Sequence, residues 1–179
     1  MYFKFTFFLF LIDSIINRGC DLTLSELISA VLDVGALYHN LLFSYQRAQR
    51  LYHGPRGSNY VLQSTLNFLL RIEEQGRLDI ENSQSLEEAI SKFADFLKKG
   101  KLIKSLTFEE QDQDQYTIRV EGCIFAGKVH KLVNTKDVTC PYAMVAMSLF
   151  NKFKGKPVIE RESTYFEDGT QTVIESTQF

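Results

Sequence analysis

The chain has 179 residues and a mass of 20.6 kDa, a length typical of one compact domain, and 45% of its residues are apolar. Its 20 basic and 22 acidic residues give a net charge of -2, which argues against nucleic-acid binding, where a strong basic excess is usual. The three cysteines, Cys20, Cys123 and Cys140, are too few for a disulfide framework and favour a reducing, cytoplasmic location.

The first twelve residues, MYFKFTFFLFLI, are almost entirely apolar. They are shorter than the roughly 20 apolar residues that cross a bilayer, so no integral membrane insertion is predicted. A signal-peptide core is one alternative, but no small-residue cleavage site follows, since the next residues include Asp13, Asn17 and Arg18. A buried first element or a dimer contact fits the segment better, and a misassigned start codon would produce a similar one.

A long helix is predicted from the capping-box pattern of Thr23 and Glu26 to about Leu51. The segment 53–58, which contains two glycines and a proline, ends it. Tyrosines recur along this region every seven or eight residues, which favours a core stripe or a dimer seam over a cofactor site; they are Tyr38, Tyr45, Tyr52 and Tyr60. The apolar stripe of the helix has three- and four-residue steps and comprises Leu24, Leu27, Ile28, Val31, Val34, Tyr38, Leu41, Leu42 and Tyr45.

Two more helices are predicted before residue 101, from Asn59 to Gly76 and from a second capping box at Ser85 to Gly100. The apolar period then changes to two, which predicts a hairpin with strands at 101–108 and 115–121 and an acidic loop at 109–114.

The last third of the chain predicts a helix followed by a second hairpin. The helix covers residues 139–154, with Pro141 in its first turn, and the strands cover 158–166 and 170–177 around an Asp-Gly turn. The complete order predicts an α+β fold in which N-terminal helices pack with an antiparallel sheet built from two hairpins and a crossing helix.

Several short segments between residues 60 and 176 resemble the 4-vinyl reductase-like domain, the fold of archaeal hydrocarbon-binding proteins and of small TRAPP-complex subunits. They are the capped helix Ser85-Leu86-Glu87-Glu88-Ala89, the segment 120–126, Cys140-Pro141, the segment 160–163 and Asp168-Gly169. The resemblance implies a homodimer that shelters a small apolar molecule or docks a partner. It divides the chain into an N-terminal helical dimerisation segment, 1–58, and an α+β domain, 59–179, within one compact unit.

Zinc-containing members of that family bind the metal through a Cys, a Glu and two later Cys. Cys140 and Glu162 match the first two ligands, whereas Tyr165 and Val173 stand at the later positions. Valine cannot bind a metal and tyrosine is a rare zinc ligand. No cofactor is therefore predicted, and zinc would require a degenerate site on Cys140 and Glu162.

Cys140 is the first candidate site residue because it precedes a predicted helix N-terminus, where the helix dipole lowers the pKa of a thiol. A nucleophile, a metal ligand, an acylated thiol and a small buried apolar residue are the alternatives. Cys123, Phe125, His130 and Tyr142 complete the candidate ligand-binding set. The spacing of Cys123, His130 and Cys140 matches no compact zinc pattern, and no residue that would orient a Cys140–His130 catalytic pair can be identified.

Glu160 and Glu162 are expected on one face of a strand, where they are either solvated surface groups or an acid–base pair. The main functional hypothesis is a non-catalytic module that binds a small hydrophobic ligand. The alternative is a protein-interaction or assembly subunit with the same fold and a filled core. A Cys140-dependent enzyme is the third.

Overall fold

A computed structural model gives the structure of the protein and describes residues 24–54, 64–67, 69–71, 78–80, 82–112, 114–132 and 138–177. The chain divides into two units, Met1–Val34 and Gly35–Phe179. The described part of the first unit is the beginning of helix α2 (Leu24–His53). The apolar segment 1–12 lies outside the described residues, and the division of the chain at residue 58 stays a prediction.

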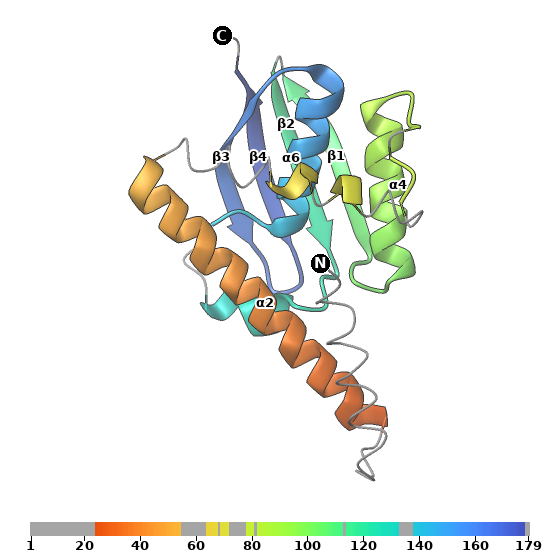
Figure 1. Ribbon diagram of the computed structural model, residues 1–179, viewed down its shortest axis with the longest axis vertical. Helices are drawn as coiled ribbons and strands as arrows, with labels where there is room; N and C mark the ends of the chain where they lie inside the picture. Colours follow the sequence, from red (N-terminus) through yellow and green to blue (C-terminus); the bar gives the residue numbers. More distant parts are fainter. Residues whose placement is uncertain are drawn as a thin grey trace. The chain divides into compact units, whose positions relative to one another are not determined.

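A four-stranded antiparallel sheet in the second unit confirms the α+β class (Figure 1). Its strands are β1 (Ser105–Asp112), β2 (Gln115–Glu121), β3 (Val158–Tyr165) and β4 (Thr170–Ser176), in the order β1-β2-β4-β3. Both predicted hairpins form, and they join through the pairing of β2 with β4. β1 is longer than expected: residues 109–112, predicted as a loop, continue the strand, and Glu109, Glu110 and Asp112 pair with β2.

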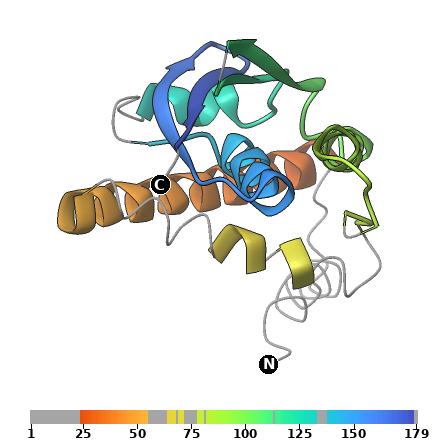
Figure 2. The same cartoon turned by 90° about the horizontal axis from the view of Figure 1, so that it is seen from above.

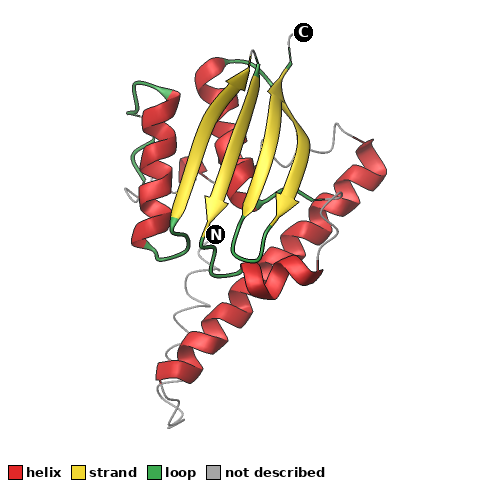
Figure 3. Ribbon diagram, turned by 180° about the vertical axis from the view of Figure 1, so that it is seen from behind, coloured by secondary structure: helices red, strands yellow, loops and turns green. Residues whose placement is uncertain are grey.

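Two helices, α4 (Leu86–Lys99) and α6 (Pro141–Lys154), cover one face of the sheet (Figures 1 and 2). No described helix covers the other face (Figure 3). The main core lies between the helices and the sheet, and its largest fully buried side chains include Phe150, Leu149, Ile118, Ile174 and Val120. The apolar faces predicted for these two helices are therefore the faces that pack on the sheet.

The ends of these helices follow their capping residues. The Ser85 hydroxyl accepts a hydrogen bond from the Glu88 N–H at 3.2 Å, and Gly100 caps the C-terminus of α4. The Glu88 carboxylate accepts the N–H of Gln84, one residue before the expected Ser85. Gly155 ends α6 with φ 65°, a left-handed conformation that glycine adopts without steric cost.

The first predicted helix is confirmed as α2, and the predicted second helix is described only at residues 64–67 and 69–71, which are helical. Among the described residues, no helix is both long enough and apolar enough to cross a bilayer.

The connection between β2 and α6 contains two short elements that sequence periodicity does not predict. They are α5 (Ala126–Val129) and the 3-10 helix η2 (His130–Leu132). With the part of α2 from Gly35 onward they form a second, smaller core, made of Ala36, Phe43, Val129 and Val138 with Phe125 and Tyr165 packed against it.

A bulge in β3 corrects the expectation that Glu160 and Glu162 share a face. Glu160 pairs with Ile174, which is fully buried, whereas Glu162 pairs with the half-buried Val173. The bulge adds one residue between the two glutamates, and an odd insertion reverses the alternation of side chains. Glu160 therefore lies on the inner side of the sheet and Glu162 on the outer side.

Candidate functional site

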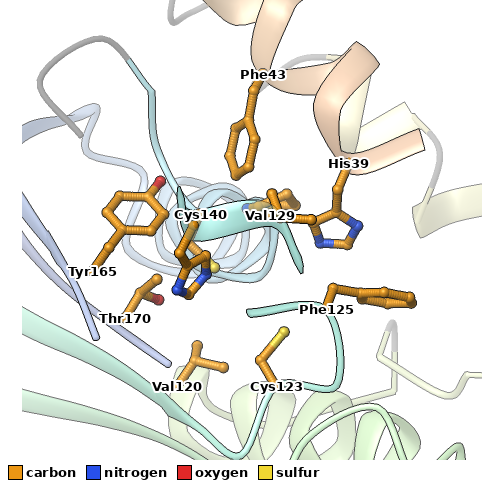
Figure 4. Close-up of a pocket in the computed structure, with 11 residues that line it drawn as sticks. His39, Phe43, Val120, Cys123, Phe125, Val129, Cys140, Tyr165 and Thr170 are labelled. Atoms are coloured by element: carbon orange, nitrogen blue, oxygen red, sulfur yellow. The ribbon is translucent and has the colours of Figure 1, made fainter. Parts of the chain in front are cut away.

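A small pocket lies beside the second core, where α2, α5 and the beginning of α6 meet (Figure 4). Its volume is about 10 Å³, which is room for a single water molecule. Four of the five residues proposed from sequence line it, and Tyr142 adjoins it. The lining residues are His39, Phe43, Val120, Cys123, Phe125, Val129, His130, Cys140, Pro141, Tyr165 and Thr170.

The histidine His39 organises the aromatic wall of this pocket. Its ring centroid is 4.7 Å from that of Phe125, 5.9 Å from that of Tyr142 and 6.2 Å from that of Phe43. Sequence reasoning missed His39, although a histidine inside a long apolar helix is a recognisable signal. Gly35, one helical turn before it, lies so close to the Phe125 ring that a Cβ atom there would overlap the ring.

The two cysteines that line the pocket are not activated. Burial raises the pKa of the Cys123 thiol to about 11. Burial also raises the pKa of Cys140, and the Thr170 hydroxyl and the backbone amides at the start of α6 oppose this rise only in part. The expectation that the helix N-terminus lowers the pKa of Cys140 is wrong, because the loss of solvation outweighs the helix dipole. The buried, apolar alternative for Cys140 agrees with its 5% exposure.

Burial lowers the pKa of both histidines in the pocket. His130 has its Nδ1 2.7 Å from the Phe166 carbonyl oxygen, so this nitrogen carries the proton and donates it. The His130 ring also meets the Tyr165 ring edge-on, with centroids 4.8 Å apart. Both imidazoles are therefore neutral at pH 7 and serve as packed aromatic groups with one polar edge.

The residues of the degenerate zinc site do not come together. Cys140 is buried on the inner side of the sheet, Glu162 is exposed on the outer side, and Tyr165 lines the pocket. Within the described parts of the chain, no group of three or more His, Cys, Asp or Glu side chains is arranged to hold a metal ion.

A polar network that sequence analysis missed fixes α2 to the rest of the unit. The Gln46 amide bonds the backbone of Thr139 twice: its Nε2 donates to the carbonyl at 3.0 Å, and its Oε1 accepts the N–H at 2.8 Å. Next to it, the Glu160 carboxylate accepts hydrogen bonds from Arg50 and from the hydroxyls of Thr139 and Ser163. Gln46 and Arg50 are four residues apart, so they lie on the same side of the helix. This spacing of polar residues is the sequence pattern that could have identified them.

The opposite side of α2, hereafter its outer face, is apolar and exposed. Phe43 is 3% exposed, whereas Tyr45, two residues later and about 200° around the helix, is 48% exposed. The outer face consists of Leu37, Tyr38, Leu41, Tyr45, Leu51 and Tyr52, with exposures from 48% to 84%. Of the alternatives for the tyrosine stripe, a core is therefore excluded for Tyr38, Tyr45 and Tyr52; Tyr60 lies outside the described residues.

No family model matches the chain, and no curated protein matches its sequence. Among solved structures, the chain is similar to a trafficking protein particle complex subunit 3 from Naegleria fowleri covalently bound to palmitic acid. The TM-score is 0.47 and the sequence identity 10%, over 84% of this chain and 98% of that chain. This is a weak likeness to a TRAPP subunit and not to a 4-vinyl reductase, and it establishes neither family nor function.

Proposed function

We propose that this chain is a non-catalytic protein-interaction or assembly subunit that binds a protein through the outer face of α2. The observation that carries the proposal is the exposure of six large Leu and Tyr side chains on one side of one helix. Single exposed apolar residues are normal, but a contiguous apolar patch on a folded domain marks an interaction site. Tyrosine is also enriched at protein interfaces, because its ring is apolar and its hydroxyl remains satisfied at the rim.

The attachment of the inner side of α2 supports the same function. Gln46 and Arg50 hold the helix to the residues before α6 and to β3 through hydrogen bonds. A helix fixed in this way loses little conformational entropy when a partner docks, and such preorganisation raises affinity. The outer face is thus presented on a rigid support.

Site-specific photo-crosslinking in cells tests this function. A photoreactive amino acid at Tyr45 is expected to form a covalent adduct with a protein, because its side chain would lie within an interface. The matched control is the same amino acid at Leu132, which is 71% exposed in η2, outside α2. Equal yields of adduct at the two positions would contradict the proposal.

The second candidate function is the binding of a small hydrophobic molecule in the pocket, as in the hydrocarbon-binding members of the 4-vinyl reductase-like family. The mixture of aromatic side chains and a few polar groups around Cys140 favours it. Ligand pockets have volumes of about 300–1,000 Å³, so Phe43 and Phe125 would have to move to admit such a molecule. Native mass spectrometry tests it: a mass excess of a few hundred daltons that disappears on denaturation supports a trapped ligand, and the bare mass of the chain contradicts it.

A Cys140-dependent enzyme is the least supported of the three hypotheses, because burial disfavours the thiolate that would attack a substrate. The proposed cytoplasmic location rests on the free thiols of Cys123 and Cys140.

A further inference from the structure

Thr170, the first residue of β4, carries a buried hydroxyl group that no described residue pairs with. The residue is 2% exposed, and its Oγ1 atom makes no hydrogen bond of normal geometry within the described parts of the chain. Leaving a buried polar group unpaired is costly, so nearly all such groups in folded proteins bond to protein or to an ordered water molecule. The hydroxyl of Thr170 therefore points to a binding partner that is not a side chain or backbone group of these residues.

The side chain of Thr170 faces the small pocket beside the second core. Thr170 lines this pocket together with Cys123 and Cys140, and Figure 4 shows the three side chains turned toward the same space. Two other buried hydroxyls lack a partner among the described residues, those of Ser83 and Ser176, but neither residue lines the pocket. Thr170 therefore combines an unpaired hydroxyl with a space next to it.

The pocket has the size and the polarity that an internal water molecule needs. Its volume of about 10 Å³ is close to the minimum for one water. A buried water usually makes about two to four hydrogen bonds, whereas an apolar cavity stays dry. Besides the hydroxyl of Thr170, the lining offers two thiols and two imidazoles, those of Cys123, Cys140, His39 and His130. Because His130 donates from its Nδ1, its Nε2 is a hydrogen-bond acceptor.

We propose that the pocket binds one internal water molecule through a hydrogen bond to the Thr170 hydroxyl, with the thiols and imidazoles of the lining as its further partners. Thr170 begins β4 and Cys140 precedes α6, so this water connects the sheet to the helix that covers it. The water also sets a requirement on any molecule that enters the pocket. A group that displaces it needs its own hydrogen bond to Thr170, because an apolar group there would leave the hydroxyl unpaired.

A high-resolution crystal structure of the full chain tests the site directly, and magnetic relaxation dispersion of the solvent counts long-lived internal waters in solution. The crystal structure is expected to show one isolated density peak within hydrogen-bond distance of Thr170 Oγ1. Thr170→Val replaces the hydroxyl by a methyl group of similar size and is expected to lose this one water from the count. Thr170→Ser keeps a hydroxyl and is expected to keep the water.

The matched control is Ser176→Ala, which removes another buried hydroxyl from the same strand at a residue that does not line the pocket. It is expected to keep the wild-type count of internal waters. Three results would each overturn the inference: an empty pocket among ordered lining side chains, density for an organic molecule against Thr170, or the same loss of water in the Thr170→Val and Ser176→Ala proteins. If circular dichroism shows that Thr170→Val does not fold, the wild-type crystal structure still decides whether the water is bound.

Discussion

The guanidinium of Arg50 on α2 donates a hydrogen bond to the carboxylate of Glu160 on β3, and the two residues are 110 positions apart in the chain. The same carboxylate accepts hydrogen bonds from the Thr139 and Ser163 hydroxyls. The side chain of Glu160 is 9% exposed and that of Arg50 is 27% exposed, so water replaces these contacts poorly. One carboxylate thus holds the long helix, the segment before α6 and the edge strand together.

Replacing this carboxylate should destabilise the fold. Glu160→Ala removes the carboxylate that accepts hydrogen bonds from Arg50 and from the hydroxyls of Thr139 and Ser163, and the loss of such a buried acceptor costs about 1–3 kcal/mol. We expect the free energy of unfolding, measured by urea denaturation, to fall by about 2–3 kcal/mol.

The matched control is Glu162→Ala, the same substitution two residues later on the exposed side of β3. It should change the free energy of unfolding by less than about 0.5 kcal/mol. Similar losses in the two variants would mean that the bulge does not separate the two glutamates onto different faces.

A second prediction concerns Gly35, which lies on α2 against the ring of Phe125. Gly35→Ala removes a flexible residue from a helix, which by itself is stabilising, but its methyl group would overlap the Phe125 ring. We expect a net loss of about 1–3 kcal/mol in the free energy of unfolding.

Two variants test the cause of that loss. Gly127→Ala, in α5, has open space around the new methyl group and should be neutral or slightly stabilising. The double variant Gly35→Ala with Phe125→Leu should lose less stability than the sum of its single variants, since the smaller side chain makes room. Strict additivity in the double variant would contradict a direct contact.

The parts of the fold that sequence analysis predicted are those that local chemistry determines. Ser85 with Glu88, Pro141, Gly155 and Asp168-Gly169 each specify a cap or a turn within a few residues, and each lies where it was expected. The bulge in β3 was not predicted, because polar residues lie on both faces of this strand. One inserted residue therefore leaves no visible break in the alternation of polar and apolar residues. The end of β1 was missed because Glu109 and Glu110 read as loop residues, although an edge strand tolerates exposed acidic side chains.

The candidate site depends on contacts between residues far apart in the chain, and the sequence alone does not show which of these residues meet. Apolar periodicity marks α2 as amphipathic, but it does not say which of two apolar sides faces the core. In the structure, Phe43 packs against Val129 and Val138, so its side of the helix faces the core and Tyr45 is exposed. Cys140 is a second example, since an activated thiol and a small buried apolar residue were both open alternatives, and the burial that decides between them could not be read from neighbouring residues.

The raised pKa values of the pocket thiols predict slow alkylation. At pH 8, a thiol with a pKa of about 11, such as Cys123, has roughly one thousandth of its molecules in the thiolate form. We expect iodoacetamide to modify Cys123 and Cys140 far more slowly in the native protein than in urea, with each site followed by peptide mass mapping. Rapid modification of Cys140 in the native protein would restore the Cys-dependent enzyme as a hypothesis.

The two pocket histidines predict that stability falls in mild acid. Burial lowers the pKa of His39 and of His130 below the ordinary value of 6.5, so the unfolded chain takes up protons at a higher pH than the folded one. Their contribution to the free energy of unfolding is complete above about pH 6.5 and is lost as the pH falls through the folded-state pKa values.

Urea denaturation between pH 7 and pH 5, above the range where most carboxylates titrate, should show this loss. The double variant His39→Gln with His130→Gln should have a flatter profile than the wild-type protein. An equal slope in the two proteins would show that the two histidines are not buried in the neutral form.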